Sequence, residues 1–234
     1  MGVQLPRWVW VGTALLAGAA GMVNVVGYLG FEHQAVTHLT GTTTLLGSAV
    51  AHGDARAALH LAGMALAFVT GAALSGLIVR DGTLRLGRRY GVVLILESLL
   101  LFASIPLFLH GYLTCALLAA MACGLQNAMV TTYSGAVIRT THVSGMFTDL
   151  GIGLGHALGG LPLQKRRLLL CGLVILSFFT GATLGAALFV RFDYRALLVP
   201  ASLTGVAGLG YALYRQLQRG KIAPQRATPD DATR

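Results

Sequence analysis

Two carboxylates stand inside long apolar stretches of this 234-residue chain, where a charge is expensive. Glu97 lies in LILESLLL and Asp149 lies in GMFTDLGIG. A carboxylate at membrane depth is costly unless it is protonated, paired or hydrated, so we predict that both acids serve coupling or proton relay. The structural alternative for Glu97 is a neutral carboxyl that bonds a serine or a backbone carbonyl of a neighbouring helix.

Histidine, hydroxyl and glycine residues recur in two related stretches. THLTGTTTLLGSAVAH begins at Thr37, and THVSGMFTDLGIGLGH begins at Thr141. A hydroxyl–glycine pair at a helix start can cap N–H groups and let a ligand approach the backbone, and a helix N-terminus favours an anionic or dipolar ligand. The alternative role is capping and anchoring alone. The candidate substrate-binding residues here are His38, Thr40, Gly41, His142, Ser144 and Gly145.

Matching blocks flank the two stretches in the same order. GMVN, ending at Asn24, precedes the first, and GLQN, ending at Asn127, precedes the second. FVTGAALSG and FFTGATLGA follow them, which indicates an internal duplication. In membrane transporters, related halves commonly meet at the substrate site. We therefore add Asn24, Gln126 and Asn127 to the candidate binding residues, with support of a broken helix as the alternative role of each asparagine.

The composition is that of a membrane protein. Hydrophobic residues make up 55% of the chain, charged residues 11%, and the mean hydropathy is +0.72. The net charge of +9 comes from residues at the ends of apolar runs, so it indicates membrane topology and argues against a nucleic-acid partner. The three cysteines have no paired metal spacing and are expected to be buried apolar residues, and we assign no metal or cofactor.

Six apolar runs are long enough to span a bilayer. Each duplicated stretch has 16 residues, roughly 24 Å as a helix, which falls short of a hydrocarbon core of about 30 Å. We therefore expect two re-entrant or broken helices, with full spanning as the alternative. Six spans with a cytosolic N-terminus place all 17 Lys and Arg residues inside except Arg56, Arg191 and Arg195. The predicted spans are 8–30, 57–79, 91–109, 112–133, 168–190 and 196–214.

The predicted fold is an all-α membrane protein with about six transmembrane helices in two repeats, each with a re-entrant or broken helix. Repeat one covers about 8–110 and repeat two about 111–214, within a single transmembrane domain over 1–214. Three spans per repeat is an odd number, so the repeats are expected to be inverted and both termini cytosolic. The polar, proline-containing segment 215–234 is predicted to be a disordered cytosolic tail.

Four of these motifs resemble a known family. GMVNVVGYL, HLTGTTTLLG, GLQNAMV and THVSGMFTDLG are similar to the YoaK-type family of bacterial multi-pass membrane proteins, a family of unknown function. The resemblance implies a bacterial inner-membrane protein of about six spans and supplies no substrate. Family members commonly have Asp at the position of Asn24, and T-G-N where this chain has Thr40, Gly41 and Thr42. If that aspartate couples protons in the family, the role here would fall to Asp149 or Glu97.

The function that the sequence favours is a transporter or channel for a small polar solute or ion, with its site between the repeats. The alternative is a structural or regulatory membrane subunit without transport activity. An intramembrane enzyme is less favoured, because the chain contains no G-x-S-x-G or H-E-x-x-H motif. The partners expected are the lipid bilayer and the solute or ion, and a homo-oligomer is compatible with the sequence.

Overall fold

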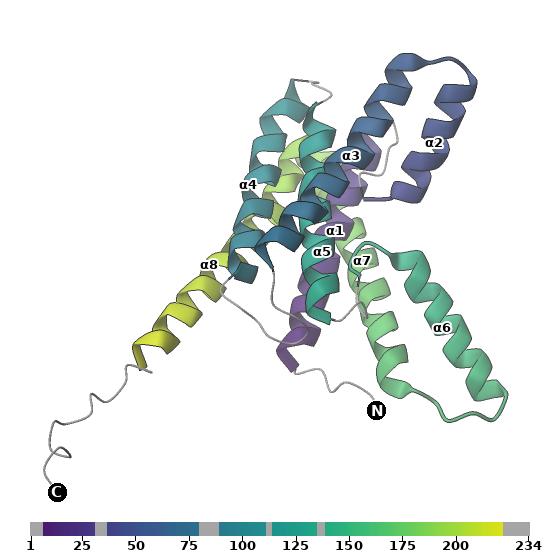
Figure 1. The fold of residues 1–234 in the computed structure, drawn as a ribbon, viewed down its shortest axis with the longest axis vertical. Helices are drawn as coiled ribbons and strands as arrows, with labels where there is room; N and C mark the ends of the chain where they lie inside the picture. The colour runs from purple at the N-terminus through teal and green to yellow at the C-terminus, as the bar shows by residue number, and fades with distance from the viewer. Residues whose placement is uncertain (1–6, 31–36, 80–88, 111–113, 135–138, 222–234) are drawn as a thin grey trace, which may run out of the picture.

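The computed structural model describes residues 7–30, 37–79, 89–110, 114–134 and 139–221, and within these ranges the regular structure is entirely helical (Figure 1). A short 3₁₀ helix, η1, separates the last two α-helices. The elements are α1 (Arg7–Gly30), α2 (Leu39–Ala51), α3 (Ala55–Ile78), α4 (Arg89–Leu109), α5 (Thr114–Ser134), α6 (Val143–Leu158), α7 (Lys165–Phe192), η1 (Asp193–Leu197) and α8 (Leu198–Lys221).

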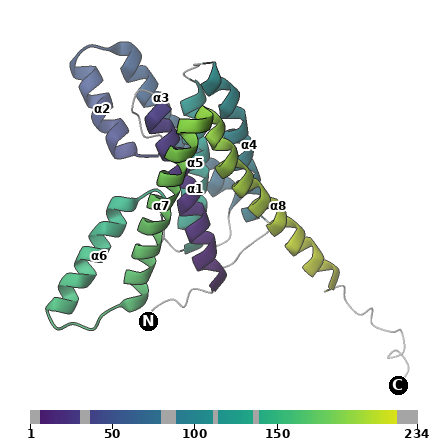
Figure 2. The same ribbon diagram turned by 180° about the vertical axis from the view of Figure 1, so that it is seen from behind.

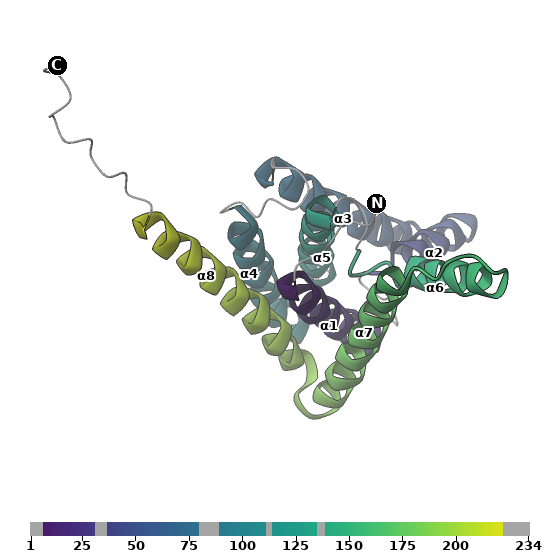
Figure 3. The same ribbon diagram turned by 90° about the horizontal axis from the view of Figure 1, so that it is seen from below.

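Five segments of the described chain are long and apolar enough to cross a membrane. Four correspond to α1, α3, α4 and α5, and the fifth runs over 50 residues through α7, η1 and α8. Fifty residues of straight helix would be about 75 Å long, far more than one crossing requires. The segment is not straight, since α7 and α8 form a V that opens away from η1 (Figure 3).

The bend between α7 and α8 is built from a residue in an unusual conformation and an aromatic anchor. Asp193 has φ 53°, a value that side-chain-bearing residues seldom adopt, and it ends α7. The next residue, Tyr194, donates its hydroxyl to the carbonyl of Gly30 and stacks on Phe108 with ring centroids 4.6 Å apart. The turn is thereby attached to the ends of α1 and α4.

Helices of one duplicated half pack against helices of the other half. α1 packs along α7, and α3 packs along α5, so the first helix of each half lies against the third helix of the other half. Equivalent glycines allow the two helices of each pair to come close together. A Cβ on Gly21 would lie 2.2 Å from the carbonyl oxygen of Phe178, and a Cβ on Gly124 would lie 2.1 Å from the carbonyl oxygen of Phe68. Small residues are what permits such close helix crossings in a membrane.

The two short helices lie beside the third helix of their own half. α2 contacts α3, and α6 contacts α7, and neither contacts another of the described elements. The α2–α3 hairpin projects from one end of the molecule and the α6–α7 hairpin from the other, with the start of α1 and the end of α8 at the α6–α7 end (Figures 1 and 2). At 13 and 16 residues, roughly 20 and 24 Å, both helices are shorter than a bilayer core.

The last helix continues beyond its predicted end. The candidate membrane segment ends at Tyr214, as predicted, but the helix itself continues to Lys221, into the segment for which we expected a disordered tail. The sequence RQLQRGK contains mainly strong helix formers, and the first helix breaker that follows is Pro224. Residues 222–234 of the predicted tail lie outside the described ranges.

Candidate functional site

The first turn of each short helix carries the predicted histidine and glycine. Nδ1 of His38 accepts a hydrogen bond from the backbone N–H of Gly41, at 3.3 Å, and so caps α2. His142 occupies the N-cap of α6 without such a bond. A Cβ on Gly41 or Gly145 would lie 2.7 or 2.6 Å from Nδ1 of the histidine of its own turn, so both glycines leave room for an imidazole ring.

Hydroxyl groups follow on the exposed faces of both helices. Thr44 donates to the carbonyl of Thr40 at 2.9 Å, and Thr148 donates to that of Ser144 at 3.0 Å, which are again equivalent positions. These bonds satisfy the threonine protons within the helix and make the exposed faces tolerable in lipid. The side chains of Thr40 and Ser144 themselves are exposed at the helix starts.

The equivalent asparagines Asn24 and Asn127 differ in their partners. Oδ1 of Asn24 accepts from both the backbone N–H and the hydroxyl of Thr37, at 3.1 and 2.6 Å, and so holds the residue that leads into α2. Oδ1 of Asn127 is buried and accepts no hydrogen bond from the described residues. The bonds of Asn24 are of the supporting kind that the sequence analysis gave as its alternative role, while Oδ1 of Asn127 has no partner among the described residues.

Gln126 uses its amide within the protein. Nε2 donates to the carbonyl of Leu16 at 2.8 Å and to the hydroxyl of Thr140 at 3.0 Å, and the side chain is 2% exposed. These bonds fasten α5 to α1 and to the segment that leads into α6. Its amide nitrogen therefore positions neighbouring segments, and the substrate contact that we predicted for Gln126 stays a prediction.

The two acids occupy different environments. Glu97 is 2% exposed on α4, and its Oε2 has no hydrogen-bond partner among the described residues. Asp149 is 30% exposed on α6 and forms a 3.0 Å ion pair with Arg167 at the start of α7. Glu97 is thus an isolated buried carboxyl group, whereas Asp149 is a paired carboxylate that joins two helices.

The sequence did not reveal the partner of Asp149. Arg167 lies in a basic run that the topology argument assigned to a loop, and only the tertiary fold brings it to α6. A signal was nevertheless present. The first half has Leu45 at the position equivalent to Asp149 and Ala57 at the position equivalent to Arg167, so it lacks both the acid and its base.

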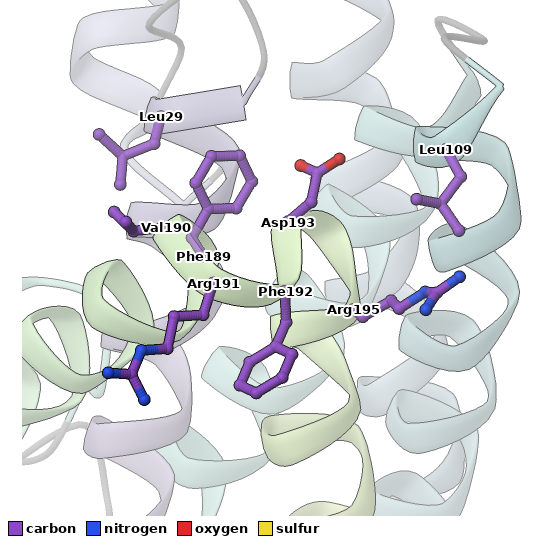
Figure 4. A pocket seen from close by; sticks show the side chains of 8 residues that line it. All are labelled: Leu29, Leu109, Phe189, Val190, Arg191, Phe192, Asp193 and Arg195. Atoms are coloured by element: carbon purple, nitrogen blue, oxygen red, sulfur yellow. The ribbon is translucent and has the colours of Figure 1, made fainter.

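The starts of α2 and α6 face each other near the middle of the molecule, although the two helices are not in contact (Figures 1 and 2). This arrangement brings the two predicted clusters to the same level. The pocket shown in Figure 4, about 700 Å³, lies elsewhere, at the η1 end. Its arginines, Arg191 and Arg195, point in different directions and do not converge on one ligand (Figure 4).

A second, smaller cavity of about 190 Å³ lies between α1, α4, α5 and α8, at the end that carries the start of α1. Its walls are mostly apolar, with three aromatic residues and one threonine hydroxyl. The lining residues are Trp8, Val9, Gly12, Thr13, Leu16, Tyr90, Leu94, Met129, Val130, Ala207 and Tyr211.

Apolar helices of membrane-spanning length, crossing through glycine contacts, define a multi-pass α-helical membrane protein. The chain belongs to the family described as protein of unknown function (DUF1275), whose family model matches residues 12–210. This family contains the YoaK-type proteins, so the resemblance seen in the motifs is confirmed. No curated protein and no solved structure matches the chain.

Proposed function

We propose that this protein is a transporter or channel for a small polar solute or ion. The site lies where the first turns of α2 and α6 face each other, near Asn127. The observation that carries the proposal is the pair of equivalent short helices, α2 and α6. Both start near the middle of the molecule and run toward opposite ends (Figure 1). Backbone that starts inside a bilayer needs polar surroundings, and helix starts in transporters bind polar solutes.

The proposed arrangement is an inverted repeat. The packing of α1 against α7 and of α5 against α3, each through equivalent glycines, supports an inverted relation between the repeats. It includes six crossings, with α7 and α8 counted separately, and two re-entrant helices. We place the protein in the bacterial inner membrane with both termini in the cytosol, because this orientation satisfies the distribution of Lys and Arg.

The two asparagines provide the test. Asn127→Leu removes the free acceptor, so we expect solute flux in reconstituted vesicles to fall about tenfold or more while the melting temperature in detergent changes little. Asn24→Leu removes the two bonds to Thr37, so its main effect should be a loss of stability of about 1–3 kcal/mol. Candidate solutes are screened with wild-type vesicles first.

The two outcomes separate the proposal from its alternative. If Asn127→Leu destabilises the protein as much as Asn24→Leu and leaves flux intact, Asn127 has a packing role and the proposed site is wrong. If wild-type vesicles conduct none of the polar solutes or ions in the screen, the alternative of a structural or regulatory subunit is favoured.

A further inference from the structure

We propose that Glu97 exchanges protons with one side of the membrane only, through the cavity between α1, α4, α5 and α8. This inference rests on the proposed function in treating Glu97 as a coupling group. It goes beyond that function in naming the ligand, a proton carried by water, and the side from which it arrives. The side is the end of the molecule that carries the start of α1.

The carboxyl group itself supplies the first observation. Glu97 is 2% exposed, its Oε2 has no hydrogen-bond partner among the described residues, and the ion pair found there, Asp149–Arg167, does not include it. Among the described residues, the titratable group that interacts with it electrostatically is the buried thiol of Cys123 on α5. A buried carboxyl without a charged partner is tolerated when it is protonated or meets water, and an unsatisfied oxygen often marks a water that bonds to it.

The position of Glu97 along α4 supplies the second observation. Leu94 lines the cavity, and Glu97 lies one turn further along the same buried stripe of the helix, about 4.5 Å deeper. Gln126 donates to the carbonyl of Leu16, another residue of the cavity wall, so a buried polar side chain is bonded to the wall of the cavity. Thr13 adds a hydroxyl group to the wall itself.

At the opposite end, the η1 pocket of Figure 4 reaches Leu109 of α4, about 18 Å from Glu97 along the helix, and a packed core lies between them. Beyond Glu97, α4 buries Leu101 and Phe108 against Leu197 of η1, and none of these side chains is more than 3% exposed. Tyr194 covers this core by stacking on Phe108. A proton that reaches Glu97 from this end would have to cross this close-packed apolar core, whereas the cavity at the other end begins one helical turn from Glu97.

The helix pairs explain why the two ends differ. α4 packs along α5, but its counterpart α8 contacts α1 far less extensively. The C-terminal half of α8 leaves the bundle (Figures 1 and 3), and the cavity lies beside this divergence, with Ala207 and Tyr211 of α8 in its wall. The four helices are therefore closely packed between Glu97 and η1, and they part on the other side of Glu97, where the cavity lies.

The test is the hydrogen–deuterium exchange of the Glu97 carboxyl group, followed by infrared spectroscopy of the whole protein in lipid. The carbonyl stretch of a protonated carboxylic acid shifts when the protein is transferred to D₂O, and Glu97→Gln identifies the band. Gly12→Leu places a side chain in the cavity at a position where a Cβ meets nothing within 4 Å. Gly210→Leu, at an equally open position of α8 outside the cavity, is the matched control.

We expect a Glu97-dependent band in the wild type. Its exchange should be slowed about tenfold or more by Gly12→Leu and left unchanged by Gly210→Leu, since a filled cavity admits water only after local opening. The absence of the band from the folded wild type would overturn the proposal. Equal exchange rates in the Gly12→Leu variant and the wild type would also overturn it, as would an equal slowing of exchange by Gly210→Leu. Solute flux is measured on the same variants, so a failure of transport with cavity-dependent exchange intact refutes the proposed function alone.

Discussion

At the scale of single residues, glycine decides where the helices of this protein can meet. A Cβ on Gly181 of α7 would lie 2.0 Å from the carbonyl oxygen of Gly18 on α1, and a Cβ on Gly71 of α3 would lie 2.0 Å from that of Met121 on α5. No side chain can replace the missing hydrogen at these positions without moving a backbone. The crossings of the two halves thus depend on the same residue type for the same reason.

This dependence predicts the effect of a single methyl group. Gly181→Ala should lower the free energy of unfolding by about 1–3 kcal/mol, because α1 and α7 must separate to admit the new atom. Gly172→Ala, on the same helix but with nothing within 4 Å of its Cβ, is the control and should be neutral or slightly stabilising. Denaturant titration in detergent micelles measures both, and equal effects would show that the crossing tolerates a larger residue.

At the scale of elements, α6 differs from α2 in how it is attached to its neighbouring helix. Asp149 of α6 pairs with Arg167 of α7, whereas the equivalent positions of α2 and α3 hold Leu45 and Ala57. Both members of the pair are partly exposed, so the contribution to stability is modest, about 0.2–1 kcal/mol. Its main consequence is orientation, because the pair fixes α6 against α7 along the half of α7 that carries the basic run.

Breaking this pair should loosen α6 selectively. Asp149→Asn should raise the amide hydrogen exchange of α6 and leave that of α2 unchanged, and Arg167→Gln should do the same. The exchanged pair, Asp149→Arg with Arg167→Asp, is expected to restore part of the protection. If α2 and α6 respond equally to the single substitutions, the ion pair is not what holds α6 in place.

At the scale of the whole molecule, the two hairpins project from opposite ends (Figure 1). The turn between α2 and α3 should therefore be accessible from one side of the membrane and the turn between α6 and α7 from the other. Single cysteines at Ala55 and Gln164 probe the two turns. Ala55 is preferred over Asp54, whose carboxylate accepts from the N–H of Ala57 and caps α3.

The labelling experiment uses a background in which the three native cysteines, all buried, are replaced by alanine. An impermeant maleimide should label the Ala55→Cys protein from the periplasmic side and the Gln164→Cys protein from the cytosolic side in membrane vesicles of defined orientation. Labelling of both from the same side would contradict the inverted arrangement and, with it, the six-span topology.

The sequence by itself determined that the chain is built of apolar helices of membrane-spanning length and that its motifs occur twice. Apolar runs and their lengths are local properties, so the predicted span 91–109 agrees with α4 to within two residues. The duplicated motifs likewise indicated which short stretches would be helical and where they would begin. The predicted burial of the three cysteines followed from their apolar neighbours and is confirmed.

Only the tertiary structure decided which residues remain free to do chemistry. Asn24 and Asn127 occupy equivalent positions, yet the first is bonded to Thr37 and the second keeps an open acceptor. Asp149 is paired with an arginine of another helix, while Glu97 has no ion-pair partner among the described residues. These differences arise from contacts between segments distant along the chain. Local hydropathy and spacing carry no information about which helix becomes the neighbour of which.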